Sequence, residues 1–204
     1  QMQYIENFVD SFEYALAGAN FTDSLEGYSK YIDVNSFIDL YIINELSRNI
    51  DGYRLSTYMY KDRDDNGGKL TMGPFWDYNL AYGNADYCDG WNTSGWEQDG
   101  VCVDVGNNPF WFDRLLDDTT YQNKLKCRWQ YLRENSFHQD SLFNFIDSVG
   151  LYLDESQQRN FQKWDILGNY VWPNYYVGAT YQDELNFLKD WVGDKLVWID
   201  NNLP

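Results

Sequence analysis

The strongest constraint on the fold is a β-hairpin predicted in the middle of an otherwise helical chain. Two strand-like runs, Tyr53–Tyr60 and Lys69–Trp76, flank the polar segment Lys61–Gly68. Within that segment, Asn66-Gly67 is a strong signal for a tight turn between antiparallel strands. A hairpin brings the residues before its first strand close to those after its second. The sequence therefore predicts a meeting point at the open end.

Apolar residues recur at helical spacing on both sides of this hairpin. Helices are predicted over residues 3–19 and 36–48, where Ser36 followed by Asp39 could form a capping box. Residues 83–109 are rich in Gly, Asn and Asp, which predicts a long insertion or lid. Further helices are predicted over residues 110–116, 121–133, 141–153, 155–165 and 181–201. The chain of 204 residues is therefore expected to be a single α+β domain, 1–204, that is mainly helical.

The composition limits the partners of this chain. Hydrophobic residues make up 44% of it and aromatic residues 19%, which is enough apolar surface for a packed core. The formal net charge of −17 opposes binding to nucleic acid or to an anionic membrane surface, since both need Lys and Arg. No apolar run approaches the roughly 20 residues that span a bilayer. A nucleotide remains compatible with an acidic chain, because Mg²⁺ bridges carboxylates and phosphates.

Two carboxylates are expected at the open end of the hairpin. If Tyr60 lies roughly opposite Leu70, antiparallel register brings Asp51 close to Asp77. Carboxylates that close together raise a pKa or attract a cation, and both outcomes are typical of functional sites. The structural alternative is that Asp51 merely ends a helix and Asp77 caps a turn before Asn79. The residues alone leave both interpretations open.

The order of these parts is that of a protein kinase. In kinases a catalytic-loop Asp is followed by a metal-binding Asn, and later by the metal-binding Asp of the D-F-G segment. Here Asp51, Ser56, the hairpin and Asp77 follow in the same order. The chain resembles the CotH kinase family, the spore coat protein H-like group of atypical, secretory-type protein kinases. The matching segments are Asn44-Glu45-Leu46, Asn49–Gly52, Tyr58–Lys61, Gly68–Leu70 and Gly73–Gly83.

The resemblance implies ATP-dependent transfer of phosphate to Ser or Thr of secreted or surface proteins, with Mg²⁺ or Mn²⁺. It implies that Asp51 orients the acceptor hydroxyl and that Asp77 binds the metal. Ser56 and Asn79 are further metal candidates, although family members often carry Asn and Asp there, respectively. A hydroxyl and an amide ligate hard cations less strongly than a carboxylate, so an active kinase and a pseudokinase both remain open. Supporting roles at the nucleotide site are expected for Asn44, Glu45 and Trp76.

The fold that the resemblance implies is a kinase-like C-lobe with a central hairpin and a helical C-terminal half. Helical spacing begins almost at the first residue, with Tyr4, Phe8 and Phe12, and the chain has no Gly-rich phosphate loop. We therefore expect the N-lobe, with the Lys–Glu pair that fixes the α- and β-phosphates, to lie upstream of Gln1. These residues alone could then fold and yet be inactive.

The tip of the hairpin offers a second metal hypothesis. Asp62, Asp64 and Asn66 followed by Gly67 match the first half of a calcium-binding loop. Gly73 stands where such a loop needs its bidentate Glu. A weak Ca²⁺ site and a solvated polar turn both fit this half motif, because Asp, Asn and Gly also favour turns.

Aromatic residues suggest a rival function, an extracellular module that binds glycans or proteins. Trp and Tyr present flat apolar faces on which sugars stack. Trp91 and Trp96, in the loop-rich region, are the best candidates for exposure, whereas others fit core packing. A disulfide between Cys88 and Cys102 would brace the same region and favour an exported protein, with Cys127 left over. Three reduced thiols, with Cys127 in the core, are the alternative.

Overall fold

The computed structural model describes residues 2–100, 102 and 108–204. Within them the protein is a mainly helical α+β fold with a single two-stranded antiparallel hairpin. The helices are α1 (Met2–Ala17), α2 (Val34–Ser47), α3 (Trp111–Leu116), α4 (Thr119–Glu134), α5 (Gln139–Tyr152), α6 (Asp154–Lys163) and α7 (Tyr181–Asn202). The strands are β1 (Met59–Lys61) and β2 (Leu70–Met72), and short 3₁₀ helices are η1 (Tyr28–Lys30), η2 (Asp64–Asn66) and η3 (Glu97–Asp99). All the predicted helices are confirmed, with ends within two residues of those expected.

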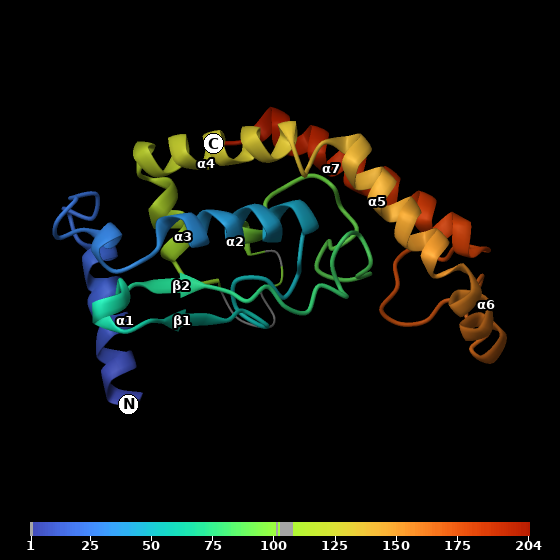
Figure 1. Ribbon diagram of the computed structural model, residues 1–204, viewed down its shortest axis with the longest axis horizontal. Coiled ribbons are helices and arrows are strands. Elements are labelled where there is room, and N and C mark those ends of the chain that lie inside the picture. The colour runs from blue at the N-terminus through green and yellow to red at the C-terminus, as the bar shows by residue number, and fades with distance from the viewer. Residues whose placement is uncertain (1, 101, 103–107) are drawn as a thin grey trace.

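Helix α2 is the centre of the core. It lies between the hairpin on one side and α4 and α7 on the other (Figure 1). Phe37, Ile38 and Tyr41 are almost completely buried, and most of the other α2 side chains are buried as well. A helix that is apolar around most of its circumference has to be enclosed on all sides. The polar residues Asn44 and Glu45, near its C-terminal end, are enclosed with it.

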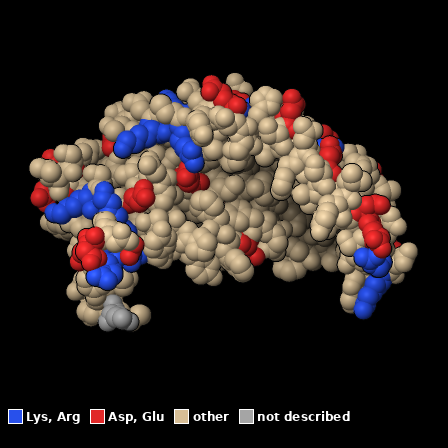
Figure 2. Space-filling model, viewed as in Figure 1, with Lys and Arg blue, Asp and Glu red and all other residues tan. Residues whose placement is uncertain are grey.

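The outer helices extend this core into an arch. Helix α1 packs against α3 at one end, and α5 packs along α7 and continues into α6 at the other (Figure 1). Figure 2 shows a concave surface beneath the arch with few charged side chains, while Lys and Arg gather toward the two ends. In the described part of the chain, no helix is both long enough and apolar enough to cross a membrane.

The start of α2 differs from the predicted capping box. Asp33 is the N-cap, and its Oδ1 accepts hydrogen bonds from the backbone N–H groups of Asn35 at 3.0 Å and Ser36 at 3.4 Å. The Ser36 hydroxyl accepts instead from the N–H of Met72 at 3.0 Å, and Asp39 pairs with Arg128. The helix therefore begins earlier than the periodicity indicated, because an Asp immediately before it satisfies its free N–H groups.

The hairpin is shorter than predicted and its register differs by one residue. Tyr60 pairs with Thr71, and Leu70 pairs with Lys61 rather than with Tyr60. The outer edge of β2 explains the register, because the Leu70 N–H donates to the Tyr31 carbonyl at 2.8 Å and the Leu70 carbonyl accepts from Asp33. These bonds fix Leu70 in the core, and a one-residue slip would turn it to the other face.

Described residues of the segment 83–109 form a loop that the core holds from two sides. Arg48, just after α2, donates to the carbonyls of Asp89, Ser94 and Gly95 at 2.9, 2.8 and 3.1 Å. A disulfide joins Cys88 to Cys102, which settles the pairing that the sequence left open. Cys127 is free and exposed on α4, as expected if it is left over from the disulfide, and the alternative that placed it in the core is wrong. It lies on the outer face of a helix whose buried face includes Leu125 and Trp129.

Candidate functional site

A hydrogen bond between two predicted site residues closes the open end of the hairpin. The Ser56 hydroxyl Oγ donates to Asp77 Oδ2 at 3.2 Å. Closer to the strands, the Gly73 N–H donates to the Tyr58 carbonyl at 2.8 Å. Ser56 and Asp77 have φ values of 46° and 67°, in the left-handed region, which costs about 1–3 kcal/mol for residues other than Gly. Strain of this kind gathers at functional sites, so the contact is a candidate for one.

Asp51 lies in the loop that leads from α2 to Ser56. Its backbone N–H donates to Asn49 Oδ1 at 3.3 Å, and its carbonyl accepts from the Leu55 N–H at 3.0 Å, which folds the loop tightly. The Asp51 side chain is 24% exposed, and its Oδ1 lies 4.0 Å from Arg54 Nη2. The loop thus carries a partly exposed carboxylate at its start and reaches Asp77 through Ser56 at its end. A direct approach of Asp51 to Asp77 stays a prediction.

Asn44 joins the two segments that carry these carboxylates. Its Oδ1 accepts a hydrogen bond from the Tyr78 hydroxyl at 2.8 Å, next to Asp77 in the sequence. Its side chain also packs on Gly52, next to Asp51, where a Cβ atom would lie 3.0 Å from Asn44 Cγ. Asn44 is buried, so it acts on the site by holding both neighbours in place.

Glu45 is buried beneath the Asp51 loop. Its carboxylate accepts hydrogen bonds from the Tyr53 hydroxyl at 2.7 Å and from the backbone N–H groups of Glu97 and Gln98 at 2.7 and 2.9 Å. Burial raises the pKa of Glu45, while the Tyr53 hydroxyl and the Lys195 ammonium lower it. The side chain therefore ties the Asp51 loop to η3 from below.

Three charged residues of this buried cluster were not predicted from the sequence. Arg48, Glu97 and Lys195 are at most 2% exposed. The Lys195 ammonium donates to the Gly95 carbonyl at 2.9 Å. One signal was present, because Lys195 lies on the α7 face formed by Trp191, Val192 and Ile199, where helical spacing predicts an apolar residue.

Comparison with protein families identifies the chain. A family described as CotH kinase protein matches residues 1–199. The chain belongs to the CotH kinase family. Membership confirms the resemblance, whose matching segments lie between Asn44 and Gly83, and extends it over the helical half. A search of curated proteins found no match.

CotH membership leaves the roles of single residues as predictions, and the structure places them as follows. Trp76 lies beside Asp77 and is 60% exposed. Asn79 is also exposed, and its backbone carbonyl accepts a hydrogen bond from Asn84 Nδ2 at 2.8 Å. Trp76, Asp77 and Asn79 therefore lie at the surface, whereas Asn44 and Glu45 lie beneath it.

The CotH family implies a nucleotide and a divalent cation, and the open end of the hairpin fits both together. The described residues contain no group of three or more His, Cys, Asp or Glu that could hold a metal alone. Mg²⁺ at nucleotide sites is held by one or two carboxylates, with substrate phosphates and water supplying other ligands. Asp77 and Ser56 provide oxygen atoms of this kind. The donor set therefore fits a cation shared with bound phosphate.

The tip of the hairpin has its own hydrogen bonds. Asp64 Oδ1 accepts from the Lys61 ammonium at 2.6 Å and from the Tyr4 hydroxyl at 3.2 Å. Asp62 accepts from the side-chain amide of Asn66. These contacts use the Asp62 carboxylate and one Asp64 oxygen and place an ammonium beside them, which favours the polar turn over the weak Ca²⁺ site.

Trp91 and Trp96, the residues predicted for an exposed aromatic platform, are partly packed against other aromatic rings. Both are only partly buried by the measure of the whole residue, yet Trp96 packs edge-on against Trp198 at 4.7 Å between ring centroids and also contacts Tyr41. Trp91 stacks on Tyr175 at 5.1 Å. The physical reason is that η3 and α7 enclose this loop. Trp172 is more exposed, at 70%, and stacks on Tyr87.

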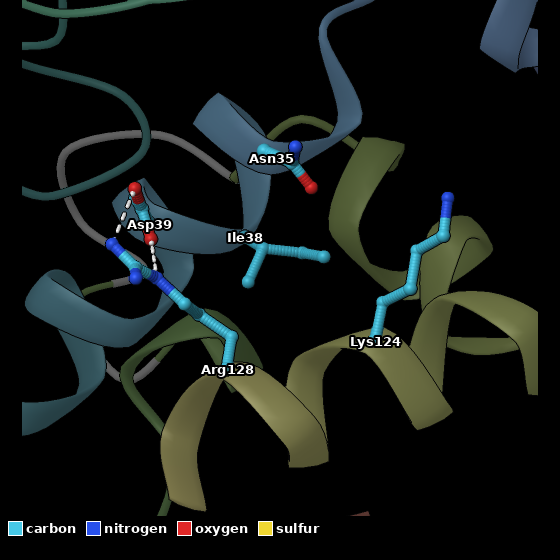
Figure 3. Close-up of a pocket in the computed structure, with 5 residues that line it drawn as sticks. All are labelled: Asn35, Ile38, Asp39, Lys124 and Arg128. Carbon is cyan, nitrogen blue, oxygen red and sulfur yellow. Dashed lines mark hydrogen bonds and ion pairs between the residues drawn. The ribbon is translucent and has the colours of Figure 1, made fainter. Parts of the chain in front are cut away.

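A cavity of about 350 Å³ lies elsewhere, between α2 and α4 (Figure 3). Its lining residues are Asn35, Ile38, Asp39, Lys124 and Arg128. Figure 3 shows the Arg128 guanidinium turned toward Asp39, with hydrogen bonds of 2.8 and 3.2 Å, and Lys124 pointing away from that pair. The cavity adjoins the first half of α2, whereas Asp51 follows its C-terminal end, so it is separate from the candidate site.

The buried cluster predicts a pH dependence of stability. Burial raises the pKa of Glu97 to about 7; Arg48, Arg54 and Lys195 lower it, and Glu45 raises it. Because this folded pKa exceeds the unfolded value of 4.5, the folded protein binds the proton more tightly, and stability falls as pH rises from 4.5 to about 7. We expect Glu97→Gln to remove roughly 3 kcal/mol of that fall.

Urea unfolding at a series of pH values measures this effect. The difference in free energy of unfolding between Glu97→Gln and the unaltered protein should grow in favour of the variant between pH 4.5 and 7. Parallel curves for the two proteins would contradict it. Well above pH 7 the difference in free energy of unfolding between the two proteins should stop changing with pH, because the Glu97 carboxyl is then ionised in the folded and the unfolded state.

Proposed function

We propose that this chain carries the acceptor-orienting and metal-binding side chains of an ATP-dependent protein kinase, which phosphorylates Ser or Thr of secreted or surface proteins. The observation that supports this most directly is the contact between Ser56 and Asp77 at 3.2 Å, at the end of the loop that begins with Asp51. These residues occupy the places in the chain where kinases carry their metal ligands and catalytic Asp. Membership of the CotH kinase family supports the same reaction class.

In the proposed reaction Asp51 accepts a hydrogen bond from the acceptor hydroxyl and orients its oxygen toward the γ-phosphorus of ATP. A bond forms between that oxygen and the phosphorus while the bond from the phosphorus to the β,γ-bridging oxygen breaks. ADP leaves with the electron pair of the broken bond, and the hydroxyl proton passes to the Asp51 carboxylate. Positioning supplies most of the rate in reactions of this type.

Asp77 and Ser56 would hold Mg²⁺ or Mn²⁺, which when bound neutralises negative charge on the phosphates. Glu45 and Asn44 have positioning roles in this proposal. Glu45 holds Tyr53, two residues after Asp51, and Asn44 holds Tyr78, one residue after Asp77. The residues that contact ligand are thus fixed to α2, the most buried helix of the fold.

A thermal-shift measurement with ATP and MnCl₂ tests the metal role of Asp77 in the full-length protein. Saturating ligand stabilises a protein by about 2.7 kcal/mol at one hundred times Kd, which is roughly 5–10 °C for a chain of this size. We expect this shift in the unaltered protein and its loss in Asp77→Asn. Asp65→Asn is the matched control, because Asp65 lies at the far end of the hairpin, where it pairs with Arg63.

Two results would count against the kinase proposal. One is a shift of equal size in Asp77→Asn and the unaltered protein. The other is the absence of any shift with ATP and MnCl₂, together with stabilisation by a metal-independent glycan. The second result would favour a glycan-binding module, whose candidate surface is Trp172 stacked on Tyr87 at 6.1 Å. In that case Trp172→Ala should abolish the glycan effect.

Export is the proposed location. The disulfide between Cys88 and Cys102 is the observation that favours it, because disulfides persist mainly in oxidising compartments. The proposed acceptors, secreted or surface proteins, belong to the same compartment.

A further inference from the structure

Arg54 is a buried cation beside Asp51 without a hydrogen-bonding partner among the described residues. Its side chain is 6% exposed. Nε and Nη2 make no hydrogen bond to any described atom. Nη2 lies 4.0 Å from Asp51 Oδ1, which is too far for a hydrogen bond. A guanidinium stays protonated in proteins, so this is a buried charge with two unused donor nitrogens, Nε and Nη2.

The neighbouring groups leave those donors free. Glu97 is a second carboxylate close enough for the charge of Arg54 to lower its pKa. Both carboxylate oxygens of Glu97 also lack hydrogen bonds to described residues. Burial raises the pKa of the Tyr87 phenol, with Asp51 raising it further and Arg54 lowering it. Arg54 is therefore within electrostatic range of Asp51, Tyr87 and Glu97, and it is hydrogen-bonded to none of them.

The two unused atoms specify the chemistry of a ligand. Nε and Nη2 belong to one edge of the planar guanidinium, and their N–H groups point in nearly the same direction. Two oxygens of a phosphoryl group match such an edge, with two parallel charge-assisted hydrogen bonds. A buried charge whose donors make no hydrogen bonds is costly even beside a carboxylate, and an anionic ligand that accepts those bonds removes much of that cost.

We propose that Arg54 binds the phosphoryl group that is transferred at Asp51, an inference that rests on the proposed kinase function. Both nitrogen atoms are buried in this structure, so binding of the phosphoryl group requires the Arg54 side chain to move. ATP carries this phosphoryl group and ADP lacks it. Arg54 therefore distinguishes the two nucleotides, whereas Asp77 would hold a divalent cation with either of them.

Calorimetric titration of the full-length protein with ATP and with ADP, each with MnCl₂, tests this assignment. We expect Arg54→Gln to weaken ATP binding by about 10- to 100-fold, the range for loss of a charge-assisted hydrogen bond. ADP binding should change by less than about threefold. Arg54→Lys keeps the charge but loses the two-donor edge, so its ATP affinity should lie between those of Arg54→Gln and the unaltered protein. Arg63→Gln is the control, since Arg63 pairs with Asp65 at the exposed tip.

The outcomes separate this proposal from the one on which it rests. Failure of the unaltered protein to bind ATP overturns both. Normal ATP binding with equal ATP-to-ADP affinity ratios in Arg54→Gln, Arg54→Lys and the unaltered protein overturns the role of Arg54 alone. A structural role beside Glu97 would lower the melting temperature of Arg54→Gln and leave that ratio unchanged, which also overturns it. If Arg54→Gln does not fold, the ratio measured in Arg54→Lys decides.

Discussion

Replacing Asp51 by Asn should reduce the rate of phosphoryl transfer by about 10²- to 10⁴-fold, the range for loss of a positioned proton acceptor. The amide keeps the shape of the side chain but accepts a proton poorly. ATP affinity in the presence of MnCl₂ should stay within about threefold of normal, because Asp51 is assigned to the acceptor hydroxyl rather than to the nucleotide. Single-turnover transfer of labelled phosphate to a Ser-containing acceptor protein, with calorimetric ATP binding, measures both quantities.

Asp62→Asn is the matched control for Asp51→Asn, since Asp62 is a carboxylate at the exposed tip of the same hairpin. Its transfer rate should equal that of the unaltered protein. Normal transfer by Asp51→Asn would remove Asp51 from the reaction. Loss of ATP binding together with transfer would move Asp51 from the acceptor to the nucleotide, and the proposed division of roles between Asp51 and Asp77 would be wrong.

Helices were predictable from this sequence because their evidence is local. Each has apolar residues at i, i+3 and i+4 over several turns, and tertiary contacts shift only its ends. The start of α2 illustrates such a shift. Ser36 and Asp39 had the spacing of a cap, but Ser36 bonds to the strand at Met72 and Asp39 pairs with Arg128 on α4.

The hairpin register and the buried cluster depend on partners far away in the sequence. Leu70 takes its place from bonds to Tyr31 and Asp33, which no pattern within the hairpin reveals. Glu45 accepts hydrogen bonds from η3, 52 and 53 positions further along the chain. The sequence could therefore mark Glu45 as a site residue through its family motif, but it could not indicate what the carboxylate holds.

The candidate site was also predictable only where its signal is local in the sequence. The order Asp51, Ser56, hairpin, Asp77 was visible in the sequence. The hydrogen bond between Ser56 and Asp77 agrees with the prediction that the hairpin brings the residues on its two sides together. Arg54 carried no signal of its own, because Arg side chains are mostly exposed. Its side chain is only 6% exposed in the folded loop, and its charge acts on Tyr87 and Glu97, which lie far along the chain.

Glu45→Ala should lower the free energy of unfolding by about 3–5 kcal/mol, because removing one member of a buried charged cluster leaves the others uncompensated. The Tyr53 hydroxyl and two backbone N–H groups would lose their acceptor. Burial lowers the pKa of Lys195 to about 8, and Lys195 would lose the carboxylate that most opposes that lowering. Urea unfolding measures the loss, with Glu155→Ala on the exposed face of α6 as a control expected within about 0.5 kcal/mol of the unaltered protein.

A second substitution identifies which part of the Glu45 effect is electrostatic. In the double variant Glu45→Ala with Lys195→Met, the ammonium is replaced by an apolar side chain of similar length, so the cost of an uncompensated buried cation disappears. The double variant should therefore be more stable than the sum of the two single changes predicts. If the two changes are strictly additive, the loss of stability in Glu45→Ala comes from the three hydrogen bonds alone. If Glu45→Ala lowers the free energy of unfolding by less than about 1 kcal/mol, α2 does not anchor the Asp51 loop through this carboxylate.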